Sequence, residues 1–281
     1  MVRLGVRAHD FGKLPADVLA QKISEKGFTS IQLTLQEAIK GIDTVFGKLN
    51  PGMANHIGET FRKQNIQIAV LSCYINPIHP DKKERKKQID GFKEYIRYAR
   101  DFGCSIVATE TGSVNTDFSF SPQNHSEKSF QTLLKSIGEM VEEAEKFGVF
   151  VGIEGVEKYV AYNPQKIKRM LDTFKTNNLQ IVFDPVNLLS ASNYIDRERI
   201  IEESFELFGD KIAVFHAKDF IIDNGCMKKV QIGEGLMDYE PIIKLLEKHK
   251  PYTNFIMEEI DINTVDDQLK YIKDICCQIP A

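Results

Sequence analysis

Four residues that can bind a metal ion lie in the second half of the chain, each directly after a short apolar run. They are separated by 30, 32 and 42 residues, and they are Glu154, Asp184, His216 and Glu258. An ionisable side chain at such a place is costly to bury without a partner, and neighbouring carboxylates raise one another's pKa. A divalent cation would relieve both effects. Carboxylate oxygens with one imidazole suit Mn, Mg or Co, and Zn is an alternative.

A metal held in this way predicts proton chemistry beside a carbonyl group. A divalent ion bound to a carbonyl and an adjacent hydroxyl acidifies the C–H bond between them and stabilises the enediolate. A carboxylate removes the proton; its return from the opposite face gives an epimer, and its return to the next carbon gives an isomer. Glu154 and Glu258 are the candidate acid/base pair. Strand alternation leaves Glu258 and Glu259 as alternative ligands.

Eight short apolar runs are the candidate strands that must position these residues. Several are almost continuously apolar, which is typical of parallel strands buried on both faces. The runs span residues 2–6, 31–35, 67–71, 105–108, 149–153, 179–183, 212–215 and 254–257.

Longer amphipathic segments follow each run and predict helices that bury one stripe against a sheet. Proline near the start and glycine after the end mark several of their boundaries. The predicted helices span residues 15–26, 51–64, 83–102, 126–147, 164–174, 197–208, 239–249 and 264–277.

Eight strand–helix units favour a single (β/α)8 TIM barrel formed by one domain, residues 1–281. A doubly wound open sheet is the other common solution, but its G-x-G-x-x-G fingerprint is missing from this sequence. The carboxyl ends of barrel strands converge on one face, where the active site lies. The four metal-binding residues would meet there.

Composition argues against several other classes of protein. The formal net charge is -4, so a basic nucleic-acid surface is not expected. The polar N-terminus does not resemble a signal peptide, and no apolar stretch is long enough to span a membrane. The five cysteines include no C-x-x-C pair, which argues against a thiolate zinc site. A cytoplasmic protein is predicted, with a homodimer as the default assembly.

Several motifs resemble the xylose isomerase-like superfamily of sugar and sugar-phosphate isomerases and epimerases, over nearly the whole chain. They are Ile153-Glu154-Gly155, Phe183-Asp184-Pro185-Val186-Asn187, Phe215-His216-Ala217-Lys218-Asp219, Gly233-Glu234-Gly235 with Asp238-Tyr239, and Met257-Glu258. The resemblance implies a metal held by Glu154, Asp184, His216 and Glu258. It also implies that Glu154 and Glu258 act on opposite sides of a bound sugar.

One position departs from the pattern of that superfamily. Many members have histidine three residues after the strand-six aspartate, where this chain has Asn187. Asparagine can hydrogen-bond a substrate oxygen or orient a ligand, but it cannot titrate.

Further residues near the predicted strand ends are candidates for substrate contact. His9 follows the first run, Tyr74 and Asn76 follow the third, and Glu110 follows the fourth. Lys218 could direct a cation at a substrate hydroxyl or phosphate, and Glu234 could support the region of His216.

The predicted substrate is a small sugar or sugar phosphate, and two other functions stay open. A metal-dependent dehydratase of an inositol-like ketone would begin with the same proton removal. A catalytically silent sugar-binding barrel is the non-enzyme alternative, although all four ligand positions are filled. The abasic-site endonuclease branch of the superfamily is disfavoured by only six histidines and the negative charge.

Overall fold

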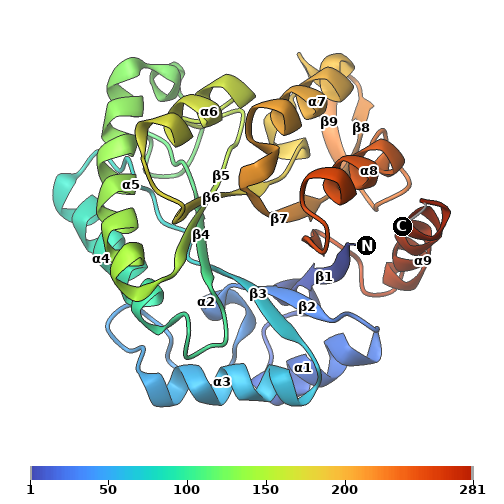
Figure 1. The fold of residues 1–281 in the computed structure, drawn as a ribbon, viewed down its shortest axis with the longest axis horizontal. Helices are drawn as coiled ribbons and strands as arrows, with labels where there is room; N and C mark the ends of the chain where they lie inside the picture. Colours follow the sequence, from blue (N-terminus) through green and yellow to red (C-terminus); the bar gives the residue numbers. More distant parts are fainter. Residues whose placement is uncertain (1, 280–281) are drawn as a thin grey trace.

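The computed structural model describes residues 2–279 and contains a closed barrel of eight parallel strands surrounded by helices (Figure 1). The strands follow the order β1-β10-β7-β6-β5-β4-β3-β2 around the barrel. This arrangement confirms the predicted (β/α)8 fold. The barrel strands are β1 (Arg3–Arg7), β2 (Ser30–Leu33), β3 (Gln67–Ser72), β4 (Ile106–Glu110), β5 (Phe150–Glu154), β6 (Leu179–Phe183), β7 (Ile212–Ala217) and β10 (Asn254–Met257).

The eight predicted helices are present, with small differences at their ends. Asn50, Ser126 and Asn163 cap three of them by accepting hydrogen bonds from backbone amides of the first turn. Within residues 2–279, no helix is long and apolar enough to cross a membrane. The helices are α1 (Ala16–Glu25), α3 (Pro51–Lys63), α4 (Lys82–Tyr98), α5 (Glu127–Phe147), α6 (Pro164–Thr173), α7 (Arg197–Phe208), α8 (Tyr239–His249) and α9 (Val265–Gln278), and a short additional helix, α2, spans Leu35–Ala38.

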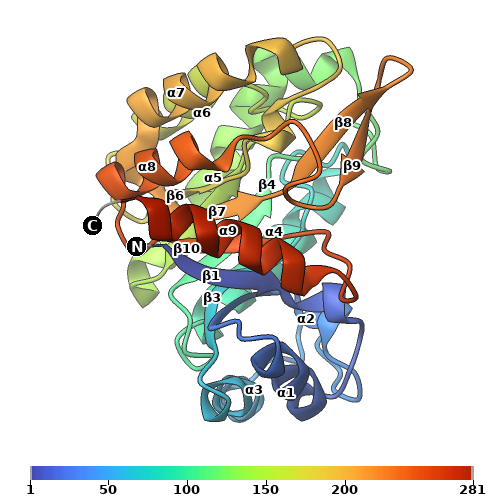
Figure 2. The same cartoon turned by 90° about the vertical axis from the view of Figure 1, so that its right-hand side faces the viewer.

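An antiparallel hairpin between β7 and α8 was not predicted from the sequence. Its strands are β8 (Asp219–Asp223) and β9 (Cys226–Val230). Asn224 and Gly225 form the turn with φ of 51° and 73°, as a type I′ hairpin turn requires. In Figure 2 the hairpin projects from the barrel on the side where the strands end.

The interior of the barrel sets the direction of the metal-binding side chains. Val182 of β6, Val214 of β7 and Ile256 of β10 belong to one buried cluster inside the barrel. Side chains two positions apart in a strand point to the same face. The next inward positions on these three strands are therefore Asp184, His216 and Glu258.

The same alternation applies to the neighbouring strands β4 and β5. Ala108 belongs to the interior cluster, and a side-chain carbon on Gly152 would lie 3.0 Å from Val182 and 3.1 Å from Ala108. Two residues further on, Glu110 and Glu154 point inward and are direct neighbours in the register of β4 and β5. Five adjacent strands thus direct ionisable side chains into the mouth of the barrel.

Candidate active site and metal centre

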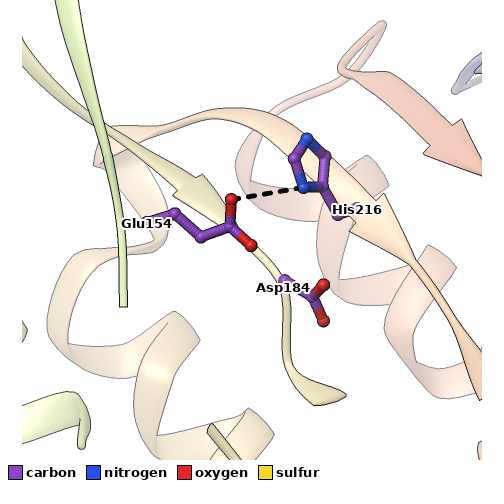
Figure 3. A group of neighbouring side chains, drawn as sticks. All are labelled: Glu154, Asp184 and His216. Atoms are coloured by element: carbon purple, nitrogen blue, oxygen red, sulfur yellow. Dashed lines mark ion pairs between the residues drawn. The ribbon is translucent and has the colours of Figure 1, made fainter. Parts of the chain in front are cut away.

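Glu154, Asp184 and His216 come together at the carboxyl ends of β5, β6 and β7 (Figure 3). One potential ligand atom from each lies within 4.8 Å of the others. The His216 Nδ1 atom is 3.6 Å from Glu154 Oε2 and 3.3 Å from Glu258 Oε1. All four side chains are buried. The tertiary structure therefore gathers the four residues that the sequence singled out.

The donor set and its hydrogen bonding fit a divalent cation. Among the residues described, neither ring nitrogen of His216 makes a hydrogen bond, and neither does Oε1 of Glu258. Buried polar atoms in such a state are costly, and a cation is a partner that both imidazole nitrogen and carboxylate oxygen can bind. The group of three carboxylates and one imidazole suits Mn, Mg, Co or Zn.

Lys218 supplies a buried positive charge beside the carboxylates. Its Nζ atom lies 2.8 Å from Asp184 Oδ2 and 2.9 Å from Glu258 Oε2. Burial lowers the pKa of Lys218, but the charges of Asp184 and Glu258 outweigh burial and raise this pKa well above its ordinary value. Lys218 is therefore a permanent cation that holds two of the candidate ligands.

The pKa values of Glu258 and His216, which lie next to each other in the cluster, are shifted in opposite directions. Burial raises the pKa of Glu258, but the charges of His216 and Lys218 outweigh it and the net pKa is lowered. Burial lowers the pKa of His216, yet the charges of Glu258 and Glu154 raise it overall. Glu258 is therefore ionised at neutral pH, as a ligand or a general base requires.

Asn187 occupies the position where many members of the resembled superfamily have histidine. Its Nδ2 donates to Glu154 Oε1 at 2.6 Å, and its backbone N–H donates to Asp184 Oδ1 at 3.1 Å. Its own Oδ1 accepts from Lys218 at 3.4 Å. Asn187 therefore orients two candidate ligands.

The Asn187→Ala variant is expected to bind the metal 10- to 100-fold more weakly, roughly the cost of losing a group that orients a ligand. The substitution removes the hydrogen bond to Glu154 but leaves the backbone contact to Asp184. Titration with Mn²⁺ measures the effect, with Asn263→Ala on an exposed loop as the control. Unchanged affinity in Asn187→Ala would contradict this orienting role.

Glu110 is a fourth carboxyl group at the barrel mouth, and its pKa is also shifted. Burial, followed by the charge of Glu154, raises the pKa of Glu110 to about 7. Close to neutral pH this group is therefore present in both protonated and ionised forms. Glu110 can therefore act as an acid or as a base. Its neighbour in the strand register, Glu154, is by contrast a candidate metal ligand.

His9 and Tyr74 lie at the rim of the same face. Nδ1 of His9 is buried without a hydrogen-bond partner among the described residues, and burial lowers the pKa of His9. The Tyr74 hydroxyl accepts a hydrogen bond from Gln32 Nε2 at 2.9 Å. Contact of these two residues with a substrate stays a prediction.

Asn76 and Glu234 are engaged differently from what the sequence suggested. The Asn76 side chain is buried and donates to the Ser113 carbonyl at 2.7 Å, so it joins the loops that follow β3 and β4. Glu234 is exposed on the loop after β9. The structure does not bring its side chain into the group around His216.

The glycines on either side of Glu234 form hydrogen bonds with Asp219. The backbone N–H groups of Gly233 and Gly235 each donate to Asp219 Oδ2 at 3.0 Å. The N–H groups of Phe220 and Met237 donate to Oδ1 at 2.8 and 3.0 Å. The buried Asp219 carboxylate thus fastens this loop next to Lys218.

We expect Asp219→Asn to lower the free energy of unfolding by about 2–4 kcal/mol, because an amide offers one acceptor oxygen where four amides converge. Chemical denaturation measures the loss. Asp223→Asn, at the exposed tip end of the hairpin, is the matched control. A loss no larger than that of the control would show that the four hydrogen bonds contribute little.

Arg7 and Gln32 are absent from the predicted site residues, yet Arg7 supports Glu258 from β1. Arg7 pairs with Asp10 at 2.7 Å and lies 3.7 Å from Glu258 Oε2. Gln32, on β2, also points into the barrel and holds Tyr74. The alternation of side chains along a strand could have identified them. Gly5 of β1 and Ser30 of β2 face each other, and Arg7 and Gln32 are the next residues on the same face of these strands.

A family model described as xylose isomerase-like TIM barrel matches residues 20–275 of the chain. Among curated proteins, an uncharacterized protein of Methanocaldococcus jannaschii, MJ1311, is 24% identical over 208 residues. The match covers 72% of this chain and 66% of that protein. The chain therefore spans slightly less than two thirds of the length of this relative.

Solved structures share the fold over nearly the whole chain. A xylose isomerase-like TIM barrel protein from Mycobacterium smegmatis in complex with magnesium has a TM-score of 0.76 at 15% identity, covering 98% of this chain and 96% of its own. A D-tagatose 3-epimerase-like protein has a TM-score of 0.76 at 18% identity, covering 98% and 97%. Other structures with this fold include sugar epimerases, a zinc-bound protein called IOLI and a probable 3-DHS dehydratase.

Proposed function

This chain belongs to the xylose isomerase-like TIM barrel family, and we propose on that premise that it is a metal-dependent isomerase or epimerase of a sugar or sugar phosphate. The proposal rests mainly on two buried carboxylates, Glu154 and Glu258, that both lie close to the imidazole of His216. They lie 3.6 and 3.3 Å from His216 Nδ1. Two carboxylates around one metal-binding centre are what proton transfer on two sides of a substrate carbon requires.

Glu154, Asp184, His216 and Glu258 are the residues that would hold one divalent metal ion. When bound, such an ion polarises a substrate carbonyl and so acidifies the neighbouring C–H bond. Mn, Mg and Co suit the oxygen-rich donor set best, and Zn is an alternative. Relatives of the same fold with magnesium or zinc bound support this range.

The side chains around the cluster have separate roles in this proposal. Glu154 removes a proton from the carbon beside the carbonyl while Asn187 holds its other oxygen in place. Glu258 stays ionised through Lys218 and Arg7 and serves as the second acid/base group. His9 and Tyr74 form part of the wall that contacts the substrate. A homodimer and a cytoplasmic location remain predictions.

A dehydratase acting on an inositol-like ketone is the second candidate, and Glu110 favours it. A carboxyl group with a pKa of about 7 can give a proton to a departing hydroxyl at neutral pH. Proton removal by Glu154 followed by loss of a β-hydroxyl would then release water. The relative of the same fold that is described as a probable dehydratase is in keeping with this chemistry. A silent sugar-binding barrel would bind sugars without either reaction.

Hydrogen exchange in D₂O tests the proposal and separates the candidates. Metal-loaded protein is incubated with a panel of ketoses, ketose phosphates and inosose, and the products are followed by NMR. We expect deuterium to enter at the carbon beside the carbonyl, together with an epimer or isomer. An unsaturated ketone product would instead favour the dehydratase. No exchange with Mn, Mg, Co or Zn would contradict both enzyme functions, and protein treated with a chelator is the control.

A further inference from the structure

A cavity of about 350 Å³ lies at the ends of β2 and β3 and against α4, and Tyr74 at the rim of the candidate site is part of its lining. Thr34 follows β2 directly, Ser72 ends β3 and Gln88 lies on α4. We propose that this cavity binds a second, neutral sugar unit, so that the substrate is a glycoside or disaccharide rather than a monosaccharide phosphate. The inference rests on the proposed function and specifies its substrate class.

Tyr74 joins this cavity to the candidate active site. Its side chain lines the cavity, while its hydroxyl accepts from Gln32 inside the barrel. Burial of this hydroxyl, followed by the charges of Glu258 and Glu154, raises the pKa of Tyr74 well above its ordinary value. The residue is still 44% exposed, so it forms a shared wall rather than a sealed partition.

The lining has the chemistry that a sugar ring needs. Phe46, Tyr95 and Phe118 offer apolar ring surfaces, and Phe46 packs edge-on against Tyr95 with ring centroids 6.1 Å apart. Gln88 donates to Glu84 Oε1 at 3.2 Å and accepts from the Asn76 backbone N–H at 2.7 Å, and the second carboxylate oxygen of Glu84 can also accept from a hydroxyl. Four of the eleven described lining residues are aromatic and most of the others are polar, and a volume of 350 Å³ falls within the range of small-molecule sites.

Thr34, one of the lining residues, carries a buried hydroxyl with no hydrogen-bond partner among the described residues. The Oγ1 atom of Thr34 makes no hydrogen bond within the described part of the chain, although the residue is only 7% exposed. An unsatisfied buried hydroxyl is costly, and a ligand hydroxyl would satisfy it. This atom marks the wall next to β2 as a place for a polar ligand group.

The negative charge of the residues that line the cavity disfavours binding of a phosphate group. Glu37 and Glu84 line the cavity, and none of its described lining residues is lysine or arginine. An anionic group placed there would meet like charges without a compensating cation. A neutral polyol has no such cost, because carboxylates accept hydrogen bonds from its hydroxyls.

Binding measurements on the metal-loaded protein test this inference. Calorimetry compares glucose and glucose 6-phosphate with maltose, cellobiose, trehalose and sucrose. We expect at least one disaccharide to bind about 10-fold or more tightly than glucose, the effect of a few added contacts. Glu37→Trp places a bulky ring in the cavity and should remove the difference between disaccharide and glucose affinity. Lys40→Trp, exposed and nearby but outside the lining, should retain it.

Three outcomes would overturn the inference. Disaccharides could bind no more tightly than glucose, the advantage could survive in Glu37→Trp, or glucose 6-phosphate could bind more tightly than every disaccharide. Failure of the proposed function is a different result. It would leave a disaccharide preference intact while no sugar exchanges deuterium in the presence of metal.

Discussion

Asp184→Ala is expected to reduce bound metal from about one divalent ion per chain to less than about a tenth, because one of the charged donors is lost. Asp184 is buried next to His216 and Glu154 in the group of three potential ligands. Its removal also leaves the Lys218 ammonium with Glu258 as the close carboxylate partner. The lysine is then free to pair more strongly with a second ligand, which weakens metal binding further.

Elemental mass spectrometry after dialysis measures the metal content of Asp184→Ala. Asp196→Ala is the matched control, because Asp196 is an exposed aspartate whose side chain pairs with Arg199. Circular dichroism of both variants separates metal loss from unfolding, and Asp184→Asn repeats the test with the side-chain shape preserved. Wild-type metal content in a folded Asp184→Ala would contradict the assignment of Asp184 as a ligand.

Glu154→Gln is expected to slow deuterium exchange beside the substrate carbonyl by about 10²–10⁴, the usual contribution of a positioned general base. Glutamine keeps the length of the side chain and an oxygen that can accept from Asn187 Nδ2. It cannot accept a proton at neutral pH. The loss should therefore affect the rate of exchange far more than the affinity for sugar.

The exchange rate is measured by NMR in D₂O, with metal content determined on the same samples. Glu142→Gln, on the exposed face of α5, controls for the loss of one negative charge. Exchange within about threefold of wild type, with metal bound, would rule out Glu154 as the base and transfer that role to Glu258 or Glu110.

The fold was predictable because local patterns specify it. Apolar runs such as Ile181-Val182-Phe183 are buried on both faces, and capped amphipathic segments such as α5 bury one stripe. The hairpin of β8 and β9 was also marked locally, by Asn224-Gly225, but short strands outside the barrel lack the long apolar run that identified the others.

Residue types and their order along the chain are enough to predict which residues meet. Glu154, Asp184, His216 and Glu258 lie at the carboxyl ends of strands of one barrel, and the parallel arrangement of those strands brings these ends to one face. This conclusion needs only the order of elements and the period of a strand, and both can be read from residue types along the chain.

The tertiary structure decided how the neighbours of these residues are used. Glu258 points into the cluster, whereas Glu259, with a φ of 60°, pairs with Lys229. Lys218 binds two candidate ligands, and the loop of Glu234 contributes backbone amides to Asp219. The pKa of Glu110 likewise depends on burial beside Glu154. Such roles depend on distances between strands and on exclusion of water, and neither quantity is encoded in the spacing of residues along one chain.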